Sequence, residues 1–176
     1  KRSKLNTLIP FTIKMKYVLF PIFVLLLIAC SSQPDVKDII ILHTNDIHSR
    51  IEPMPWNSTD DPDKGGLARI AGLIGKIRNE NEIVFLFDSG DYWQGTPYFN
   101  FFGGDVEFNF LNHMKYDAVT LGNHEFDNGI NYLAAKLGQL KMPVVVSNYD
   151  LSQTPLKERV KPYHIICKND LKIGVL

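Results

Sequence analysis

The amino-acid sequence predicts an α/β fold built on a mainly parallel sheet. Short β-branched or aromatic runs, typical of buried strands, alternate with longer segments whose apolar residues recur at helical spacing. Polar residues able to bind metal follow three of the predicted strands directly. In parallel sheets functional groups gather just beyond the carboxyl ends of the strands, so these two observations support one another.

The first predicted strand is residues 38–42 (DIIIL), a continuous apolar run that indicates burial on both faces. Residues 49–64 contain three prolines and three aspartates without periodicity, which indicates a surface loop. An amphipathic helix is predicted over 66–79, where the apolar stripe consists of Leu67, Ile70, Ala71, Ile74 and Ile77.

The alternation continues along the rest of the chain. Strands are predicted at 83–87, 118–121 and 143–147, with helices at 105–114 and 128–140. Two further strands, 163–167 and 171–176, are predicted to form a hairpin around Asn169-Asp170. We expect one domain, or part of one, from a chain of 176 residues.

The charge balance limits the class of partner. The chain has 19 basic and 19 acidic side chains, so it lacks the excess of positive charge that nucleic-acid polymers require. A small charged substrate stays possible, because bound metal ions can supply positive charge. Nothing in the sequence indicates a protein partner.

An apolar run of 13 residues, 17–29, follows Met15-Lys16. It is too short to span a bilayer as a helix, which takes about 20 residues, but it fits the apolar region of a signal peptide. A buried core segment is the alternative. We take Met15 as the start of translation, and residues 1–14 as upstream sequence or an extended basic region.

The residues around Cys30 (IACSS) resemble the lipobox of bacterial lipoproteins, in which this cysteine is acylated. The alternative is an ordinary secretory signal. We expect export to the bacterial cell envelope, periplasmic or at the cell surface, with a lipid anchor in the membrane. Residues 1–30 would then be upstream extension, signal peptide and lipobox, 31–37 a tether and 38–176 the domain. Cys167 is expected to be a buried free thiol.

Asp46 and His48 follow the first predicted strand. In extended backbone, residues i and i+2 point the same way, so this carboxylate and imidazole can reach one ion. Together they suit a divalent cation such as zinc, manganese or iron. For so short a pattern the alternative is a solvated turn.

Gly90 and Asp91 follow the second predicted strand. Glycine lets the backbone turn sharply, and a carboxylate can hold one ion with each oxygen. Asp91 could therefore bridge two ions about 3.5–4 Å apart, the spacing found in two-metal hydrolases. Asp88, three residues earlier, is expected to support the site.

Asn123, His124 and Asp127 follow the third predicted strand. The amide oxygen of Asn123 can hold a second metal, while His124 would point towards the substrate. Asp127 could accept a hydrogen bond from His124, fix its tautomer and favour its charged form. The alternative is that Asn123 caps a helix. Three such groups in order, each after a buried strand, favour a metal centre.

Three stretches resemble the ordered motifs of the calcineurin-like metallophosphoesterases: 44–48 (TNDIH), 90–95 (GDYWQG) and 122–127 (GNHEFD). They are most similar to the secreted 5′-nucleotidase and UDP-sugar hydrolase branch of that family. Residues 65–69 (GGLAR) and 147–149 (SNY) also match that branch. The similarity covers about residues 39–176.

The resemblance implies a layered α/β/β/α sandwich of the metallophosphoesterase type that holds two divalent metal ions, such as Zn, Mn or Mg. Asp46 and His48 would bind the first ion, Asn123 would bind the second, and Asp91 would bridge them. The resemblance also implies hydrolysis of nucleoside 5′-monophosphates by a hydroxide bound to both ions.

Two further residues receive roles from the same resemblance. His124 would stabilise the transition state or protonate the leaving oxygen, and Asp127 would orient it. Alternatives on the same site are a cyclic-nucleotide phosphodiesterase, a UDP-sugar hydrolase or a sulfur-ester hydrolase. An inactive surface lipoprotein fragment is an alternative of another class.

The chain departs from the family pattern downstream. The family completes its metal ligands with a later His and a Gly-His-x-His motif, and it reads the substrate with a separate C-terminal domain. After Asp127 this chain has only His164, which we expect in the core. We therefore expect a domain truncated at its C-terminal end, with weak metal binding and little turnover.

Overall fold

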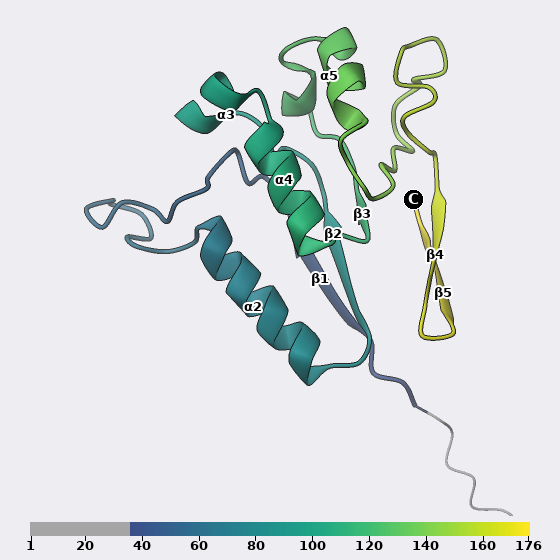
Figure 1. Cartoon of the computed structure of the whole chain (residues 1–176), viewed down its shortest axis with the longest axis horizontal. Helices are drawn as coiled ribbons and strands as arrows, with labels where there is room; N and C mark the ends of the chain where they lie inside the picture. The colour runs from purple at the N-terminus through teal and green to yellow at the C-terminus, as the bar shows by residue number, and fades with distance from the viewer. Residues whose placement is uncertain (1–35) are drawn as a thin grey trace, which may run out of the picture. The chain divides into compact units, whose positions relative to one another are not determined.

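Three parallel strands form the sheet of the computed structural model, which describes residues 36–176 (Figure 1). They are β1 (Ile40–Thr44), β2 (Val84–Asp88) and β3 (Ala118–Val119), hydrogen-bonded in that order. The register pairs Thr44 with Asp88 and Asp88 with Val119. The carboxyl ends of the three strands therefore lie side by side, and the predicted parallel α/β fold is confirmed.

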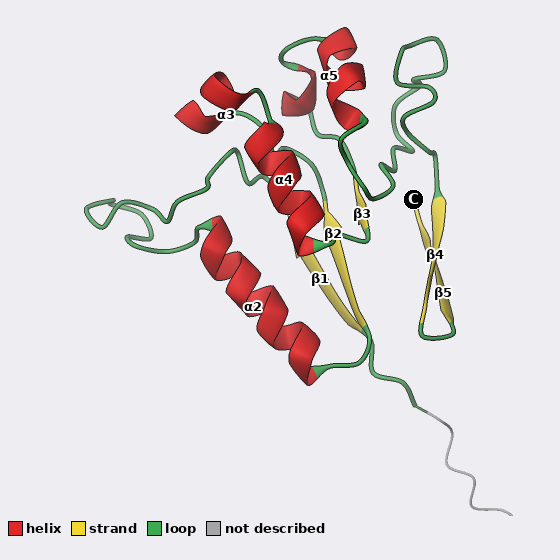
Figure 2. Ribbon diagram, viewed as in Figure 1, coloured by secondary structure: helices red, strands yellow, loops and turns green. Residues whose placement is uncertain are grey.

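Two helices, α2 (Leu67–Glu80) and α4 (Asp105–Met114), pack against each other beside the sheet (Figure 2). Ile74 of α2 and Leu111 of α4 are buried in one apolar core with Leu86 of β2. Arg78 joins the ends of the two helices by donating to the backbone oxygen of Met114 at 2.6 Å. The apolar stripe predicted for α2 thus faces the core, and α4 has the predicted bounds.

The segment beyond β2 contains a short helix, α3 (Pro97–Phe102), that the sequence analysis did not predict. It begins with a proline, whose fixed φ suits the first turn of a helix. Trp93, just before it, is fully buried and packs on Phe99 of α3 and Phe108 of α4. Trp93 and Phe99 therefore belong to the core, whereas Phe101 and Phe102 of α3 are exposed.

After β3 the chain forms a short 3-10 helix, His124–Phe126, and then α5 (Ile130–Leu137). Leu133 and Leu137 of α5 are buried in the same core. The helix is shorter than the predicted 128–140, because Gly129 and Gly138 bound it.

The predicted hairpin is confirmed as β4 (His164–Lys168) and β5 (Leu171–Val175), which pair antiparallel. Asn169 and Asp170 form the turn with positive φ, a conformation that Asn and Asp adopt more readily than most residues. Lys168 ties the hairpin to the sheet: its Nζ lies 2.7 Å from Asp117 Oδ1 and donates to the backbone oxygen of Val84.

Two strand predictions need correction. The first strand is not buried on both faces: β1 lies at the edge of the described sheet, its side chains alternate in burial, and Ile41 is 59% exposed. The predicted strand 143–147 shrinks to two isolated parallel bridges, of Val144 with Val119 and of Val145 with Lys161. An apolar run indicates that a segment is buried, but it does not indicate how many neighbouring strands the segment pairs with.

The predictions for Cys167 and His164 are also wrong. Cys167 is a free thiol, as expected, but it is exposed, and His164 is only half-buried. Both lie on β4, which pairs only with β5 among residues 36–176, so alternate side chains point away from the packed side.

The predicted signal peptide, the lipidation residue Cys30 and most of the tether lie outside the described residues. Residues Asp38–Leu176 pack as one compact unit. No helix within residues 36–176 combines the length and the apolar character needed to cross a bilayer.

Candidate metal centre at the strand ends

The loops after β1 and β2 continue to pair beyond the strands. The backbone N–H groups of Asp46 and His48 donate to the oxygens of Gly90 and Asp91, each at 3.0 Å. This pairing brings together two loops that lie far apart along the chain.

Three of the predicted ligands adopt a left-handed backbone conformation. The φ angles of Asp46, His48 and Asp91 are 52°, 49° and 55°. Asp and His adopt such angles more readily than most residues other than glycine, so these side chains suit a sharply turned backbone. The extended backbone assumed for residues 46–48 is therefore wrong, but the expected proximity holds: His48 Nε2 lies 3.8 Å from Asp46 Oδ1.

A cluster of three possible ligands lies at the centre of these loops. His48, Asp91 and His124 each offer one ligand atom, and these atoms lie within 4.8 Å of one another. The rings of His48 and His124 meet edge to face, with centroids 5.0 Å apart. Each residue comes from a different loop, so the structure brings together the ends of all three strands as predicted.

His124 is held from two sides. Its backbone N–H donates to Asp91 Oδ1 at 3.0 Å, and its ring Nδ1 lies 2.8 Å from Asp127 Oδ2. The hydrogen bond to Asp127 raises the pKa of His124, because the carboxylate favours the charged imidazole. Nε2 is left to face a substrate or a metal ion. His124 was expected to face the substrate, but its ring also lies within 4.8 Å of the ligand atoms of His48 and Asp91.

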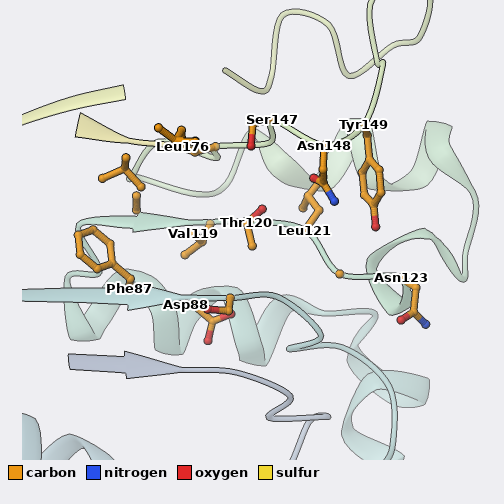
Figure 3. A pocket seen from close by; sticks show the side chains of 15 residues that line it. Phe87, Asp88, Val119, Thr120, Leu121, Asn123, Ser147, Asn148, Tyr149 and Leu176 are labelled. Carbon is orange, nitrogen blue, oxygen red and sulfur yellow. The ribbon is translucent and has the colours of Figure 1, made fainter. Parts of the chain in front are cut away.

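Asn123 lines a pocket of about 490 Å³ beside this cluster (Figure 3). Asp88, Thr120 and Tyr149 line the same pocket. Asn123 precedes the 3-10 helix, but its side chain makes no capping hydrogen bond. The capping alternative for Asn123 is therefore wrong, and its amide is available as a ligand.

Two glycines let the loops after β2 and β3 touch. A Cβ on Gly90 would overlap the backbone nitrogen of Gly122, and one on Gly122 would overlap Oδ1 of Asp91. Gly90 also has a φ of 96°, which side chains rarely allow. The position of Asp91 thus depends on the absence of a side chain at both glycines.

Two buried carboxylates, of Asp88 and Glu125, accept backbone N–H groups of the loop after β2. Asp88 accepts hydrogen bonds from Thr44 Oγ1 at 2.5 Å and from the N–H of Gly90 at 2.9 Å. Burial raises the pKa of Asp88 to about 6. The supporting position expected for Asp88 is what the structure shows.

Glu125 is the second buried carboxylate, and the sequence analysis gave it no role. It is fully buried, and burial raises its pKa to about 7, although backbone N–H groups of Asp91, Gly122 and Trp93 oppose that shift. Its position between His124 and Phe126 in the third motif was the only available signal. Its partners are backbone groups, which the side-chain pattern of a sequence does not reveal.

The donors at this site fit a divalent cation. Carboxylates at Asp46 and Asp91, an imidazole at His48 and an amide at Asn123 combine hard oxygen with borderline nitrogen ligands. Zinc and manganese accept such a set. A divalent cation held by these residues would place positive charge beside His124. Positive charge next to a proton donor favours the hydrolysis of an anionic ester.

The chain is similar to known proteins over the region that contains this site. A family model described as calcineurin-like phosphoesterase matches residues 39–173. The snake venom 5′-nucleotidase of Naja atra is 39% identical over 147 residues, which cover 79% of this chain and 28% of that protein.

Two solved structures are similar in fold and sequence. One is a 5′-nucleotidase precursor from Thermus thermophilus, with a TM-score of 0.71 and 33% identity over 77% of this chain and 27% of that chain. The other is the NAD nucleotidase of Haemophilus influenzae, with a TM-score of 0.66 and 34% identity over 77% of this chain and 25% of that one.

The chain spans about a quarter of the length of these relatives. The matched region nevertheless contains all three loops that carry the candidate ligands. Because the family model covers most of the chain, the chain belongs to the calcineurin-like phosphoesterase family, whose members use divalent metals to hydrolyse phosphoesters.

Proposed function

We propose that the protein is a metal-dependent phosphoester hydrolase that releases phosphate from nucleoside 5′-monophosphates. The observation that carries this proposal is the convergence of His48, Asp91 and His124, from three separate loops, within 4.8 Å. The names of the relatives, 5′-nucleotidases from a snake venom and from Thermus thermophilus, support the substrate class.

The metal ligands would be Asp46, His48, Asp91 and Asn123, with Asp91 shared between two ions. Bound divalent ions, such as Zn, Mn or Mg, supply positive charge that offsets the charge on phosphate and lowers the pKa of water. The left-handed backbone at Asp46, His48 and Asp91 aims these side chains before any ion arrives.

His124 would act on the substrate. Its Nδ1 pairs with Asp127, so its second nitrogen carries a proton that can be donated to the leaving oxygen. The hydrogen bond to Asp127 raises the pKa of His124, which favours the protonated ring. Asp127 would orient the ring and stabilise its charge.

A second substrate class has one observation in its favour. The likeness to an NAD nucleotidase suggests that the same site could cleave a nucleotide pyrophosphate. NAD and a UDP-sugar are therefore included with AMP and a cyclic nucleotide in the test below.

The test is phosphate or nucleotide release from this panel by the purified protein, with and without added Mn²⁺ or Zn²⁺. In line with the low turnover expected from the sequence, release from AMP should be slow and should need added metal. Asp91→Ala should lower the rate by more than about 100-fold, since even residues behind the ligands contribute 10–100-fold.

The matched control is Lys76→Ala, which changes an exposed side chain of α2 that pairs only loosely with Glu80. It should leave the rate unchanged. Release that survives Asp91→Ala would show that another site, or a contaminant, is responsible.

We further propose, from the sequence of residues 17–32, that the protein is exported and lipid-anchored through Cys30 to the bacterial cell envelope. Incorporation of a labelled fatty acid that is lost in Cys30→Ala would support this anchor. Labelling that persists in the variant would contradict it.

A further inference from the structure

The buried side chain of Glu125 accepts backbone N–H groups from two of the loops at the metal site. Its Oε2 accepts the backbone N–H of Asp91 at 2.9 Å and of Gly122 at 2.7 Å. Its Oε1 accepts the N–H of Tyr92 at 3.0 Å and of Trp93 at 3.2 Å. One side chain therefore joins the loop after β2 to the loop after β3.

We propose that Glu125 is the positioning residue of the metal centre: its carboxylate holds the left-handed turn at Asp91 and thereby sets the geometry of the ligands. The inference rests on the proposed function, because it assumes that Asp91 binds metal. It concerns a residue that touches neither the ions nor the substrate.

The turn needs an acceptor of this kind. Asp91, Tyr92 and Trp93 direct three successive N–H groups to one point, and left-handed residues in such a turn create a concave site for an anion. Without Glu125 these N–H groups would be buried and unpaired, which is unfavourable. The turn at Asp91 would then lose the hydrogen bonds that join it to the loop after β3.

The contact is reciprocal. Glu125 accepts from the N–H of Asp91, while the carboxylate of Asp91 accepts from the N–H of His124. Glu125 and His124 are neighbours in the 3-10 helix, so the two hydrogen bonds join this helix to Asp91 in both directions. Loosening one bond should let the side chains of Asp91 and His124 drift apart.

Only a carboxylate satisfies this arrangement. It offers acceptor sites on both oxygens and no donor, whereas the amide of glutamine replaces one oxygen with an NH₂ group. In Glu125→Gln that group would face two N–H donors. The variant keeps the size of the side chain, but it removes the negative charge and replaces one acceptor oxygen with a donor.

The first experiment measures Mn²⁺ affinity of the full chain by calorimetry, and checks bound Mn²⁺ by electron paramagnetic resonance. We expect Glu125→Gln to weaken Mn²⁺ binding by about 10–100-fold, as for residues that orient metal ligands. The matched control is Leu111→Ala, which also disturbs a fully buried side chain but lies in α4, within the core. Its melting temperature should fall, and its Mn²⁺ affinity should stay within about two-fold.

The outcomes separate the two proposals. If wild type binds no Mn²⁺, the proposed metal centre and this inference both fail. If wild type binds but Glu125→Gln binds equally well, or if Leu111→Ala loses affinity to the same extent, only the positioning role of Glu125 is overturned.

A second measurement does not depend on a variant that folds. In metal-free wild type, the amides of Asp91, Trp93 and Gly122 should exchange with deuterium as slowly as those of β2, because Glu125 holds them. Exchange at the rate of the exposed loop 57–61 would overturn the proposal.

Discussion

At the scale of single residues, the pair His124–Asp127 makes the clearest prediction. Asp127 raises the pKa of His124 through a 2.8 Å hydrogen bond. In Asp127→Asn the charged imidazole loses its partner, so its titration midpoint should move to lower pH. An NMR titration of the ring protons of His124 in metal-free protein measures this directly.

The sign of the effect on stability follows from the same shift. A histidine whose pKa is raised on folding stabilises the fold below its unfolded pKa of about 6.5, and this stabilisation is lost as the pH rises through the folded pKa. The destabilisation caused by Asp127→Asn should therefore be largest in mildly acidic solution, just below about pH 6.5, and shrink above neutral pH. A midpoint for His124 that is unchanged or higher in the variant would contradict the assigned contact.

The sequence predicted the candidate ligands better than their support. Asp46, His48, Asp91 and Asn123 could be found because each follows a predicted buried strand. Glu125 could not, because it acts through backbone N–H groups of residues more than 30 positions away. The left-handed conformation of three ligands could not be predicted either, because Asp and His adopt it only in particular turns.

At the scale of elements, the close contact of the loops after β2 and β3 can be tested at Gly122. A methyl group there would overlap Oδ1 of Asp91, so Gly122→Ala should displace that carboxylate. We expect metal affinity to fall by at least about 10-fold, comparable to the loss of an orienting contact. Calorimetry with Mn²⁺ measures the loss, and circular dichroism should show the helices intact.

Gly72→Ala is the matched control for this substitution. Gly72 lies on α2, is exposed, and has nothing near the position of an added methyl group. Alanine favours a helix over glycine by roughly 0.5–1 kcal/mol, so this variant should be slightly more stable and bind Mn²⁺ normally. Equal affinity in Gly122→Ala and Gly72→Ala would mean that the contact does not hold Asp91.

Among the elements, long periodic segments were easier to predict than short ones. Helices α2 and α4 match their predictions because their apolar residues recur over successive turns. The six-residue helix α3 carries too short a pattern to be recognised. The run 143–147 resembles a strand in composition, but it makes only isolated bridges, which depend on where Val119 and Lys161 lie.

At the scale of the whole molecule, the parallel topology explains why distant residues meet. Parallel strands in one sheet end at a common edge, so loops at 45–49, 89–95 and 120–127 converge without any local pattern that links them. The parallel direction of the strands could be predicted from the alternation of strands and helices, but their order in the sheet comes from the structure. The side chains at the edge could then be placed together, but not their angles or hydrogen bonds.

The central claim is that these three strand ends form one metal centre. The most direct measurement is an anomalous difference map from a crystal of the protein soaked in Mn²⁺. We predict peaks at Asp91, one shared with Asp46 and His48 and one on the side of Asn123. A map with no peak at Asp91, or with Mn²⁺ held only by exposed acidic groups such as those of loop 57–61, would contradict the account.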